Sequence, residues 1–440
     1  MNKKILIITP FCAPESHAAV FRAHKLAKYL KKEGWKPQIL TVDTNYNYNE
    51  DPALLNELEG ISIHRTKYIE PSLRGLYMWF TGKDRTYKTL KSKAHYQNKQ
   101  DLKSDECHVK KTFFRKTYNY LLENYLKKPD RFWTWKKSAI KKAKELIEKE
   151  GIQFIYTTCL PFTTNQIGIE LKKTTDIKWV SDFRDPITYA KRMHSDVFHV
   201  YKLQKQIQDD TFKYADHITV LSSSYELIFN DQYEGEYNYK ISFIPTGIDD
   251  SYIPSLNNKK KNEIIFVGEY LKEYEDHFFR IYKKAIQGNQ DVPKIRMIGN
   301  IEINKKQVSS YIKKLNIEDN IIFEDHMPQN KLYEFINNSR YALILVGNKT
   351  HWWNNFAKLV DYIALQKHVI ALVPNISEAK SELEKTKSGI FLTDNDTKNI
   401  GILKRVFDKE NSEEEIDTDY CKRYLASSQT KSFVQIFNSL

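Results

Sequence analysis

A lysine and an aspartate three residues apart, Lys358 and Asp361, form the pair in this sequence that is best placed for chemistry. The segment 355–364 is typical of a loop that leads into a helix opening near Ala357, with a buried strand after it. At a helix start, this spacing puts both side chains on one face. The free N–H groups and partial positive charge of a helix N-terminus favour phosphate. The pair therefore predicts phosphate neutralisation by Lys358 and hydrogen bonds from sugar hydroxyls to Asp361, or alternatively a plain helical ion pair.

A second candidate pair, Arg184 and Asp185, directly follows an apolar run at 179–182. Ligands of parallel sheets bind beyond the carboxyl ends of the strands, so we expect this pair to face a cleft. In one interpretation Asp185 holds a hydroxyl or a sugar and Arg184 binds a phosphate. In the other, the two residues only fix the loop before Pro186.

The elements that must position these residues are short apolar strands separated by amphipathic helices, such as a helix over 19–32 closed by Gly34. A polar stretch at 255–262 is typical of a linker. Strands are predicted at 5–9, 38–42, 61–65, 154–158, 179–182, 217–221, 241–244, 264–267, 295–298, 321–323, 342–346, 369–373 and 390–392. This alternation indicates parallel sheets covered on both faces.

We therefore predict an α/β fold of two Rossmann-like, doubly wound domains facing across a cleft. The first domain is predicted to span residues 1–250, with a basic insertion at about 67–148. The second spans 251–415, and a helical segment at 416–440 is a candidate to cross back to the first domain.

The composition excludes several classes of protein. Of the 440 residues, 41% are hydrophobic and 13% aromatic, which is too apolar for a disordered chain. The four cysteines contain no Cys-x-x-Cys pair, which argues against a zinc module or a disulfide framework. No apolar run approaches the roughly 18 residues of a membrane span, and the apolar start ends at Pro10. The sequence contains no P-loop, Ser-His-Asp constellation, metal-spaced set or Gly-x-Gly-x-x-Gly run. We expect a cytoplasmic protein without a metal or a cofactor.

The positive charge is concentrated in one stretch. The formal net charge is +13, and residues 67–148 hold 21 Lys and Arg against 9 Asp and Glu, a surplus of 12. Within this basic insertion, aromatic and leucine residues recur at helical spacing between Phe114 and Tyr125, beside a basic run at 110–116. The insertion is interpreted either as a solvated segment or as a surface that docks on anionic lipid. Nucleic acid is the least favoured partner, because the sequence contains no nucleic-acid-binding motif.

Several motifs together resemble those of retaining GT-B glycosyltransferases of family 4, in a polysaccharide-biosynthesis subset. The run around Lys358 is similar to that family's Lys-Leu-Phe-Glu-Tyr-Leu-Ala segment before a Pro-Val-Ile strand. The stretch 179–186 resembles the subset's DxRDPW segment, and Pro129-Asp130 with Trp135 resembles the segment before its fourth strand. Other similar stretches follow in the same order at 5–15, 20–30, 215–222, 244–249 and 266–268. The resemblance covers most of the chain.

The resemblance implies that a sugar moves from a nucleotide-diphosphate donor to a hydroxyl acceptor, with retention of configuration and no obligatory metal. It implies catalytic roles for Asp185, Lys358 and Asp361. The residues assigned to donor binding are Gly268, Lys272, Lys358, Leu359, Asp361 and Trp353. The residues assigned to the acceptor or diphosphate side are Ser16, His17, Arg22 and Arg184.

The sequence departs from the family pattern at three places. Trp353 replaces the first acid of the E-x7-E motif, and Asp361 replaces the second. Glu269 follows Gly268 where the family often has arginine, which leaves Lys272 as the nearest cation. The first loop lacks the usual glycines. The aromatic run 351–353 either lines the sugar pocket or packs as exposed aromatics.

Charge and resemblance together suggest a lipid-linked saccharide acceptor, with the protein peripheral at the inner face of the cell membrane and no nucleic-acid partner. Two alternatives stay open. One is a nucleotide-sugar epimerase of the same fold, and the other is a non-catalytic protein that binds a nucleotide sugar or acts as a scaffold.

Overall fold

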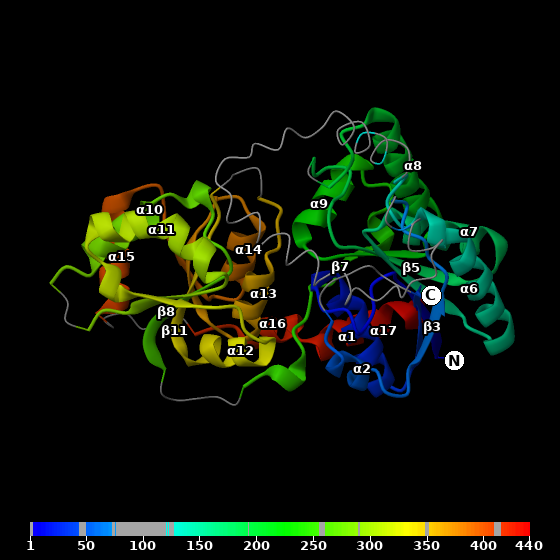
Figure 1. Ribbon diagram of the computed structural model, residues 1–440, viewed down its shortest axis with the longest axis horizontal. Helices are drawn as coiled ribbons and strands as arrows, with labels where there is room; N and C mark the ends of the chain where they lie inside the picture. The colour runs from blue at the N-terminus through cyan, green and yellow to red at the C-terminus, as the bar shows by residue number, and fades with distance from the viewer. Residues whose placement is uncertain are drawn as a thin grey trace. The chain divides into compact units, whose positions relative to one another are not determined.

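The chain forms two compact units, each built around its own parallel sheet (Figure 1). One unit comprises Met1–Leu221, Tyr225–Ile244 and Thr430–Leu440, and the other comprises Ser222–Ser224 and Pro245–Gln429. The last residues of the chain therefore belong to the first unit. The computed structural model describes residues 3–43, 50–72, 75, 120, 122, 127–191, 193–254, 260–288, 291–347, 352–408 and 415–440.

The first unit contains a seven-stranded sheet in the order β3-β2-β1-β4-β5-β6-β7, in which all neighbours are parallel. Its strands are β1 Lys4–Ile8, β2 Lys36–Val42, β3 Ser62–Thr66, β4 Phe154–Cys159, β5 Lys178–Phe183, β6 His217–Val220 and β7 Ile241–Phe243. The central strands are buried along almost their whole length, as expected for a sheet covered on both faces.

Helices cover this sheet. They are α1 Ala18–Lys32, α2 Ala53–Glu57, α6 Lys136–Glu150, α7 Phe162–Thr174, α8 Phe198–Tyr214, α9 Ser223–Gln232 and α17 Ala426–Ser439. Leu26 of α1 and Phe433 of α17 pack with Ile7 of β1 in one core. Helix α7 approaches β5 so closely that a Cβ at Gly168 would lie 2.4 Å from the indole of Trp179, so this position requires glycine.

The second unit contains a six-stranded parallel sheet in the order β10-β9-β8-β11-β12-β13. Its strands are β8 Lys261–Val267, β9 Lys294–Ile298, β10 Ile321–Glu324, β11 Ser339–Leu345, β12 His368–Leu372 and β13 Gly389–Phe391. Its helices are α10 His277–Ala285, α11 Ile301–Leu315, α12 Gln329–Asn338, α13 Ala357–Ala364, α14 Glu378–Lys385, α15 Asp396–Phe407 and α16 Thr418–Cys421.

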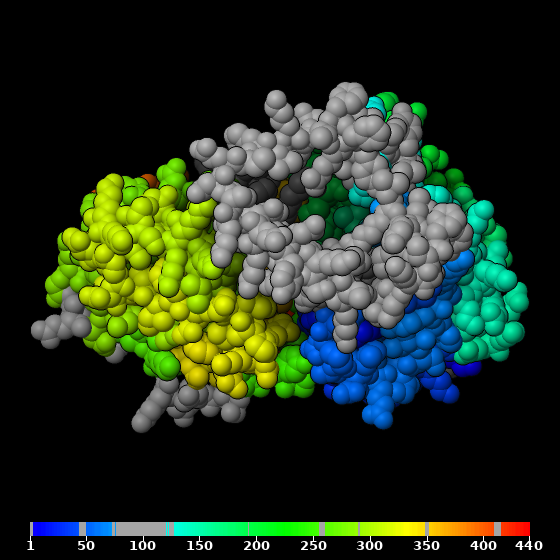
Figure 2. Space-filling model, viewed as in Figure 1, coloured from blue at the N-terminus to red at the C-terminus, as the bar shows by residue number. Residues whose placement is uncertain are grey.

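Two apolar cores lie on the two faces of this second sheet. Helices α10, α11 and α15 pack on one face, and α12, α13 and α14 pack on the other (Figure 1). In the space-filling view, yellow-green surface belongs to the second unit and blue and cyan surface to the first (Figure 2). Among the described helices, none combines the length and apolar character that crossing a bilayer would require.

The predicted fold class is confirmed, because both units are parallel α/β sheets and all thirteen expected strands are present. Their ends differ from the predicted ends by up to three residues. The expected linker at 255–262 is wrong at its end, because Lys261 and Asn262 belong to β8. Lys261 pairs with Ser339 of β11, so strand pairing outweighs the polar composition here. The amphipathic helix expected within the basic insertion lies, apart from Tyr120 and Leu122, outside the described residues.

A buried ion pair joins α1 to the middle of the first sheet. The guanidinium of Arg22 donates two hydrogen bonds to Asp182 of β5, at 2.8 and 2.7 Å, and both side chains are almost completely excluded from solvent. Thr219 of β6 also donates to Asp182, and Arg22 donates to the carbonyl of Ile244. Each charge is compensated by the other, so removing one leaves the other buried and unpaired.

Replacing Asp182 by asparagine should therefore destabilise the protein by about 3–5 kcal/mol. Urea denaturation followed by tryptophan fluorescence measures this loss. The double variant Arg22→Met/Asp182→Leu removes both charges and should lose less stability than Asp182→Asn alone.

The matched control is Asp419→Asn, which removes the partner of Lys422 from an exposed ion pair and should change stability little. An unchanged urea midpoint for Asp182→Asn would show that the buried pair does not hold the first sheet together.

Candidate functional site

The predicted phosphate-binding lysine lies on the first turn of α13 in the second unit. The ammonium nitrogen of Lys358 is 4.4 Å from the ring centroid of Phe266, a fully buried residue of β8. Among the described residues, no carboxylate lies within ion-pair distance of this ammonium. Burial lowers the pKa of Lys358 to about 8. The second unit thus holds a half-buried ammonium that its own described side chains do not neutralise.

The helical ion pair between Lys358 and Asp361 is not formed. Asp361 instead accepts a hydrogen bond of 2.9 Å from the hydroxyl of Tyr333, a fully buried residue of α12. On the next residue, the hydroxyl of Tyr362 accepts a bond of 3.0 Å from the backbone N–H of Val267. These contacts fix α13 against α12 and β8, so both predicted side chains are held by the surrounding fold.

The start of α13 offers backbone donors beside this lysine. Phe356 precedes the helix in an extended conformation and gives it no side-chain cap. At the end of β8, Gly268 has a φ of +104°, and a Cβ there would meet no atom within 4 Å. Strands β8 and β11 are neighbours at the point where the strand order reverses, which is where doubly wound sheets bind ligands. Lys358 and Gly268 are therefore brought together at the switch point of the second sheet.

Two hollows open beyond the carboxyl ends of strands in the second unit. The larger, of about 430 Å³, is lined by Trp352 and by residues that follow β12 and β13. The smaller, of about 320 Å³, lies beside η5 Lys272–Tyr274 and the end of β11. Leu372 lines both. The expected sugar-pocket residues are thus divided: Trp352 lines a hollow, Trp353 is only 3% exposed, and His351 lies outside the described residues.

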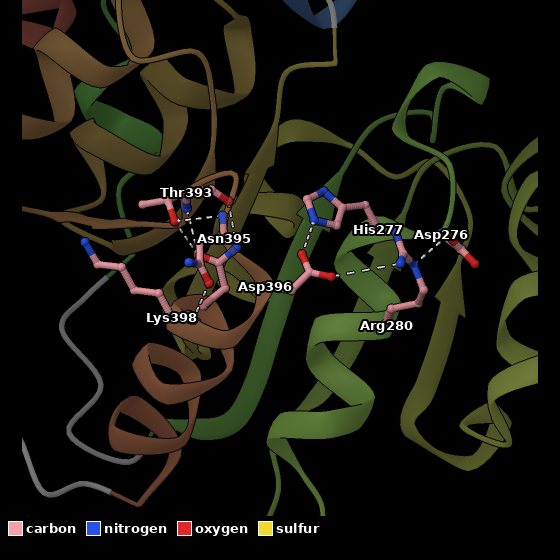
Figure 3. Close-up of polar contacts among 8 residues, drawn as sticks. Asp276, His277, Arg280, Thr393, Asn395, Asp396 and Lys398 are labelled. Carbon is pink, nitrogen blue, oxygen red and sulfur yellow. Dashed lines mark hydrogen bonds and ion pairs between the residues drawn. The ribbon is translucent and has the colours of Figure 1, made fainter.

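The basic side chains His277 and Arg280 at the smaller hollow have acidic partners, unlike Lys358. Figure 3 shows Asp396, at the start of α15, between His277 and Arg280 of α10. The imidazole of His277 lies 2.7 Å from Asp396, and a guanidinium nitrogen of Arg280 lies 3.9 Å from it. Arg280 also contacts Asp276 at 3.0 Å. This network joins the starts of two helices beside the smaller hollow.

Two predicted donor-binding residues lie outside this ion-pair network. Lys272 is exposed on η5, where its carbonyl accepts from the N–H of Glu275, and its side chain makes no hydrogen bond or ion pair with another described residue. Leu359 is completely buried in the core of the second unit, and its N–H bonds to the carbonyl of Phe356. Leu359 is therefore a core residue that helps to place Lys358. Donor contacts by Lys272, Leu359 and Trp353 stay predictions.

The predicted residues of the first loop are engaged with their own unit. His17 is the N-cap of α1: its Nδ1 accepts from the N–H of Ala19 at 3.3 Å, and its Nε2 lies 3.1 Å from Glu15. Ser16 beside it is half-buried. Arg22 is committed to the buried pair with Asp182. Contacts of these residues with a diphosphate stay predictions.

Arg184 differs from Arg22 in having unused donors. One terminal nitrogen donates to the carbonyl of Leu160 at 2.6 Å, while the buried Nε has no hydrogen-bond partner. The guanidinium carbon lies 6.0 Å from the ring centroid of Phe11. Asp185 follows at the same edge of the sheet and is half-buried. Its role toward a hydroxyl or a sugar stays a prediction.

Sequence reasoning missed the residues that extend this edge. Phe11 packs at a right angle to Phe132, with 5.4 Å between ring centroids, and the guanidinium of Arg131 lies 4.7 Å from the Phe132 ring. The adjacent Pro129-Asp130 motif was the available signal for this segment. Arg131 was counted only as part of the net positive charge of the basic insertion. For a metal, the described residues offer no group of three His, Cys, Asp or Glu side chains.

Solved structures share this architecture along their whole length. Sucrose-phosphate synthase from Thermosynechococcus elongatus has a TM-score of 0.58 at 10% identity, with 99% of this chain and 98% of that protein covered. HepE from Anabaena, in complex with UDP-glucose, has a TM-score of 0.56 at 11% identity, with coverage of 99% and 100%. The fold is GT-B. A protein from Listeria monocytogenes described as a UDP-N-acetylglucosamine 2-epimerase also shares it, with a TM-score of 0.55 at 9% identity and coverage of 100% and 96%.

No protein-family model matches the sequence, and no curated protein matches it. At identities of 9–11%, the likeness shows the GT-B fold alone. Any activity must therefore be argued from the side chains of the two units.

Replacing Lys358 by methionine should stabilise the ligand-free protein at pH 7, because the folded state otherwise holds a desolvated charge. In the folded protein the pKa of Lys358 is about 8, below its ordinary value of 10.5. The free-energy cost of holding this charge in the folded state is therefore complete below pH 8 and disappears as the pH rises toward 10.5. A pKa unit corresponds to about 1.4 kcal/mol, and we expect a gain of roughly 1–3 kcal/mol at pH 7. Urea denaturation at pH 7, 8, 9 and 10 measures it.

The control is Lys305→Met, which removes an exposed lysine 5.7 Å from the ring of Phe323 in the same unit. It should have a small effect without this pH dependence. A Lys358→Met variant that is less stable than the parent at pH 7 would contradict the placement of an uncompensated charge.

Proposed function

We propose that the protein is a glycosyltransferase that moves a sugar from a nucleoside diphosphate sugar to a hydroxyl acceptor. The observation that carries this proposal is the desolvated Lys358 ammonium, which has no carboxylate partner among the described residues and lies beside the uncapped start of α13. A diphosphate supplies the missing negative charge, and the helix N-terminus supplies donors for its oxygens. The GT-B fold supports the same conclusion, because HepE shares it and was solved with UDP-glucose.

In this mechanism Lys358 acts on the leaving group. Negative charge grows on the diphosphate as the bond to the sugar breaks, and a preorganised cation stabilises it without reorganisation. Binding of the diphosphate raises the lowered pKa of Lys358 again, so the lysine is protonated during the reaction. Asp361, oriented by Tyr333, accepts hydrogen bonds from hydroxyls of the donor.

No side chain is required as a covalent nucleophile. A diphosphate oxygen takes the proton of the acceptor hydroxyl as that hydroxyl attacks the sugar from the leaving-group face, which retains the configuration. The reaction proceeds without an obligatory metal, since Lys358 and the start of α13 carry the charge stabilisation. Membership of glycosyltransferase family 4 is part of this proposal, and it rests on the motifs around Lys358 and at 179–186.

The acceptor side is proposed from charge and resemblance. A lipid-linked saccharide in cell-surface polysaccharide synthesis is the proposed acceptor, and the basic insertion at 67–148 is the proposed contact with an anionic membrane surface. The protein is then cytoplasmic and peripheral at the inner face of the membrane.

An epimerase is the second candidate, because one structural neighbour is described as a UDP-N-acetylglucosamine 2-epimerase. The two activities differ in what they need. An epimerase converts the nucleotide sugar without an acceptor, whereas a transferase releases the diphosphate only by transfer or slow hydrolysis. Incubation with donor alone, followed by product analysis, separates them.

We expect one class of nucleoside diphosphate sugar to raise the melting temperature of the protein. A ligand at 100 times its Kd stabilises the folded state by about 2.7 kcal/mol, which corresponds to several degrees. A thermal-shift panel of uridine, adenosine, guanosine and thymidine diphosphates, each with and without a sugar, measures this effect. If no member of the panel shifts the melting temperature, the protein is not a nucleotide-sugar enzyme.

Lys358→Ala should remain folded and lose about 10²–10³ in turnover, the usual cost of removing one preorganised electrostatic partner. Turnover is measured as transfer or hydrolysis of the donor identified by the thermal-shift panel. Lys305→Ala, which removes an exposed lysine near Phe323, is the control and should keep parental turnover. Near-parental turnover in the purified Lys358→Ala protein would refute the role of this lysine.

A further inference from the structure

Two arginines and two phenylalanines form a continuous series of ring contacts in the first unit. The guanidinium carbon of Arg184 lies 6.0 Å from the ring centroid of Phe11. Phe11 packs edge-on against Phe132 at 5.4 Å, and the guanidinium carbon of Arg131 lies 4.7 Å from the Phe132 ring. We call Phe11, Arg131, Phe132 and Arg184 the arginine–phenylalanine cluster.

The guanidinium donors of this cluster are largely unused. A guanidinium has five N–H donors, and stacking on an aromatic ring engages its face and leaves its edge available. Arg184 gives one bond to the carbonyl of Leu160, and its buried Nε has no partner. Neither Arg131 nor Arg184 lies within ion-pair distance of a carboxylate among the described residues. A buried donor without a partner is costly, which favours a ligand that accepts it.

Two carboxylates next to the cluster, Asp130 and Glu15, have other partners. Asp130 accepts hydrogen bonds from the N–H and hydroxyl of Thr163, at 2.8 and 2.7 Å, and from the N–H of Phe132 at 2.8 Å. Glu15 lies 3.1 Å from the imidazole of His17. These bonds hold the two acids in place, so neither is directed at the guanidinium edges.

The cluster lies where a doubly wound sheet takes its ligand. Phe11 follows β1, Leu160 follows β4 and Arg184 follows β5. The strand order reverses between β1 and β4, and ligands bind beyond the carboxyl ends of strands at such a point. Phe11, Arg131 and Arg184 are each only partly buried, so solvent reaches part of the cluster.

We infer that the arginine–phenylalanine cluster binds a phosphate group carried by the acceptor. The planar N–H edge of a guanidinium group matches the oxygens and the negative charge of a phosphate. This inference rests on the proposed function, since the second unit then holds the donor and the first unit the acceptor. The phosphate belongs either to a phosphorylated lipid or to a phosphorylated soluble sugar, and the two sources share the chemistry that the cluster recognises.

Binding to the full chain tests the inference. The probes are geranyl phosphate and glucose 1-phosphate, and the neutral controls are geraniol and glucose, all measured by calorimetric titration. We expect phosphate probes to bind and the matching neutral compounds not to bind, with affinity that falls as salt rises. Binding of geranyl phosphate alone identifies a lipid source. Equal binding of glucose 1-phosphate and geranyl phosphate identifies the phosphate itself, as on a soluble sugar.

Arg184→Gln and Arg131→Gln should each weaken the phosphate probes by about 10- to 100-fold, the usual effect of losing a charge-assisted hydrogen bond. The matched control is Arg423→Gln, which removes an arginine that is also stacked on a ring, 4.8 Å from Tyr420 in the second unit. It should keep parental affinity. If Arg184→Gln fails to fold by circular dichroism, Arg131→Gln decides.

Parental affinity in the arginine variants, or equal binding of phosphorylated and neutral probes, overturns the inference. Titration with UDP separates this result from the proposed function. Lys358→Ala should weaken UDP and leave the phosphate probes unchanged, because these bind in different units. If the parent protein does not bind UDP, only the proposed donor site is contradicted. If it binds UDP but not the phosphate probes, only the proposed acceptor site is contradicted.

Discussion

Parallel strand pairing is the constraint on which both candidate sites depend. In each unit the strand order reverses beside the first strand, between β1 and β4 and between β8 and β11. Because crossovers in parallel sheets share one hand, the connections on the two sides of this point leave on opposite faces and open the carboxyl edge. Phe11 and Arg184 reach this edge in the first unit, and Gly268 and Lys358 reach it in the second. Residues distant in sequence thereby become neighbours.

The charged residues near these edges form two groups. Some are paired with an opposite charge of the protein, and others have no such partner among the described residues. Arg22 and Asp182 compensate each other between α1 and the first sheet, and Arg280 is paired with Asp276 and Asp396 in the second unit. Such pairs are structural, because each charge has a partner within the protein that offsets the free-energy cost of its desolvation. Lys358 is desolvated against Phe266 without a described carboxylate partner. A cation held in this way is stabilised most by an anion that arrives with a ligand.

Sequence reasoning predicted the strands and the switch-point loops well and the individual roles of the cations less well. Lys358 and Asp361 were singled out by their spacing at a helix start, and both lie at the expected place. Nothing in the spacing indicated that Asp361 would bond to Tyr333 rather than to the lysine. His17 lies on the first loop and Leu359 on α13, as expected from the sequence. In the structure His17 caps α1, and Leu359 is buried in the core of the second unit.

The sequence by itself determined the fold. Runs of apolar residues, helical periodicity and turn residues are local properties, and they decide which segments can be buried together. It also located the loops where chemistry is possible. The tertiary structure alone decided which charges are paired, because the free energy of a charge depends on the atoms packed around it. Those atoms come from remote segments: Phe266 for Lys358, Asp182 for Arg22, and Phe11 for Arg184.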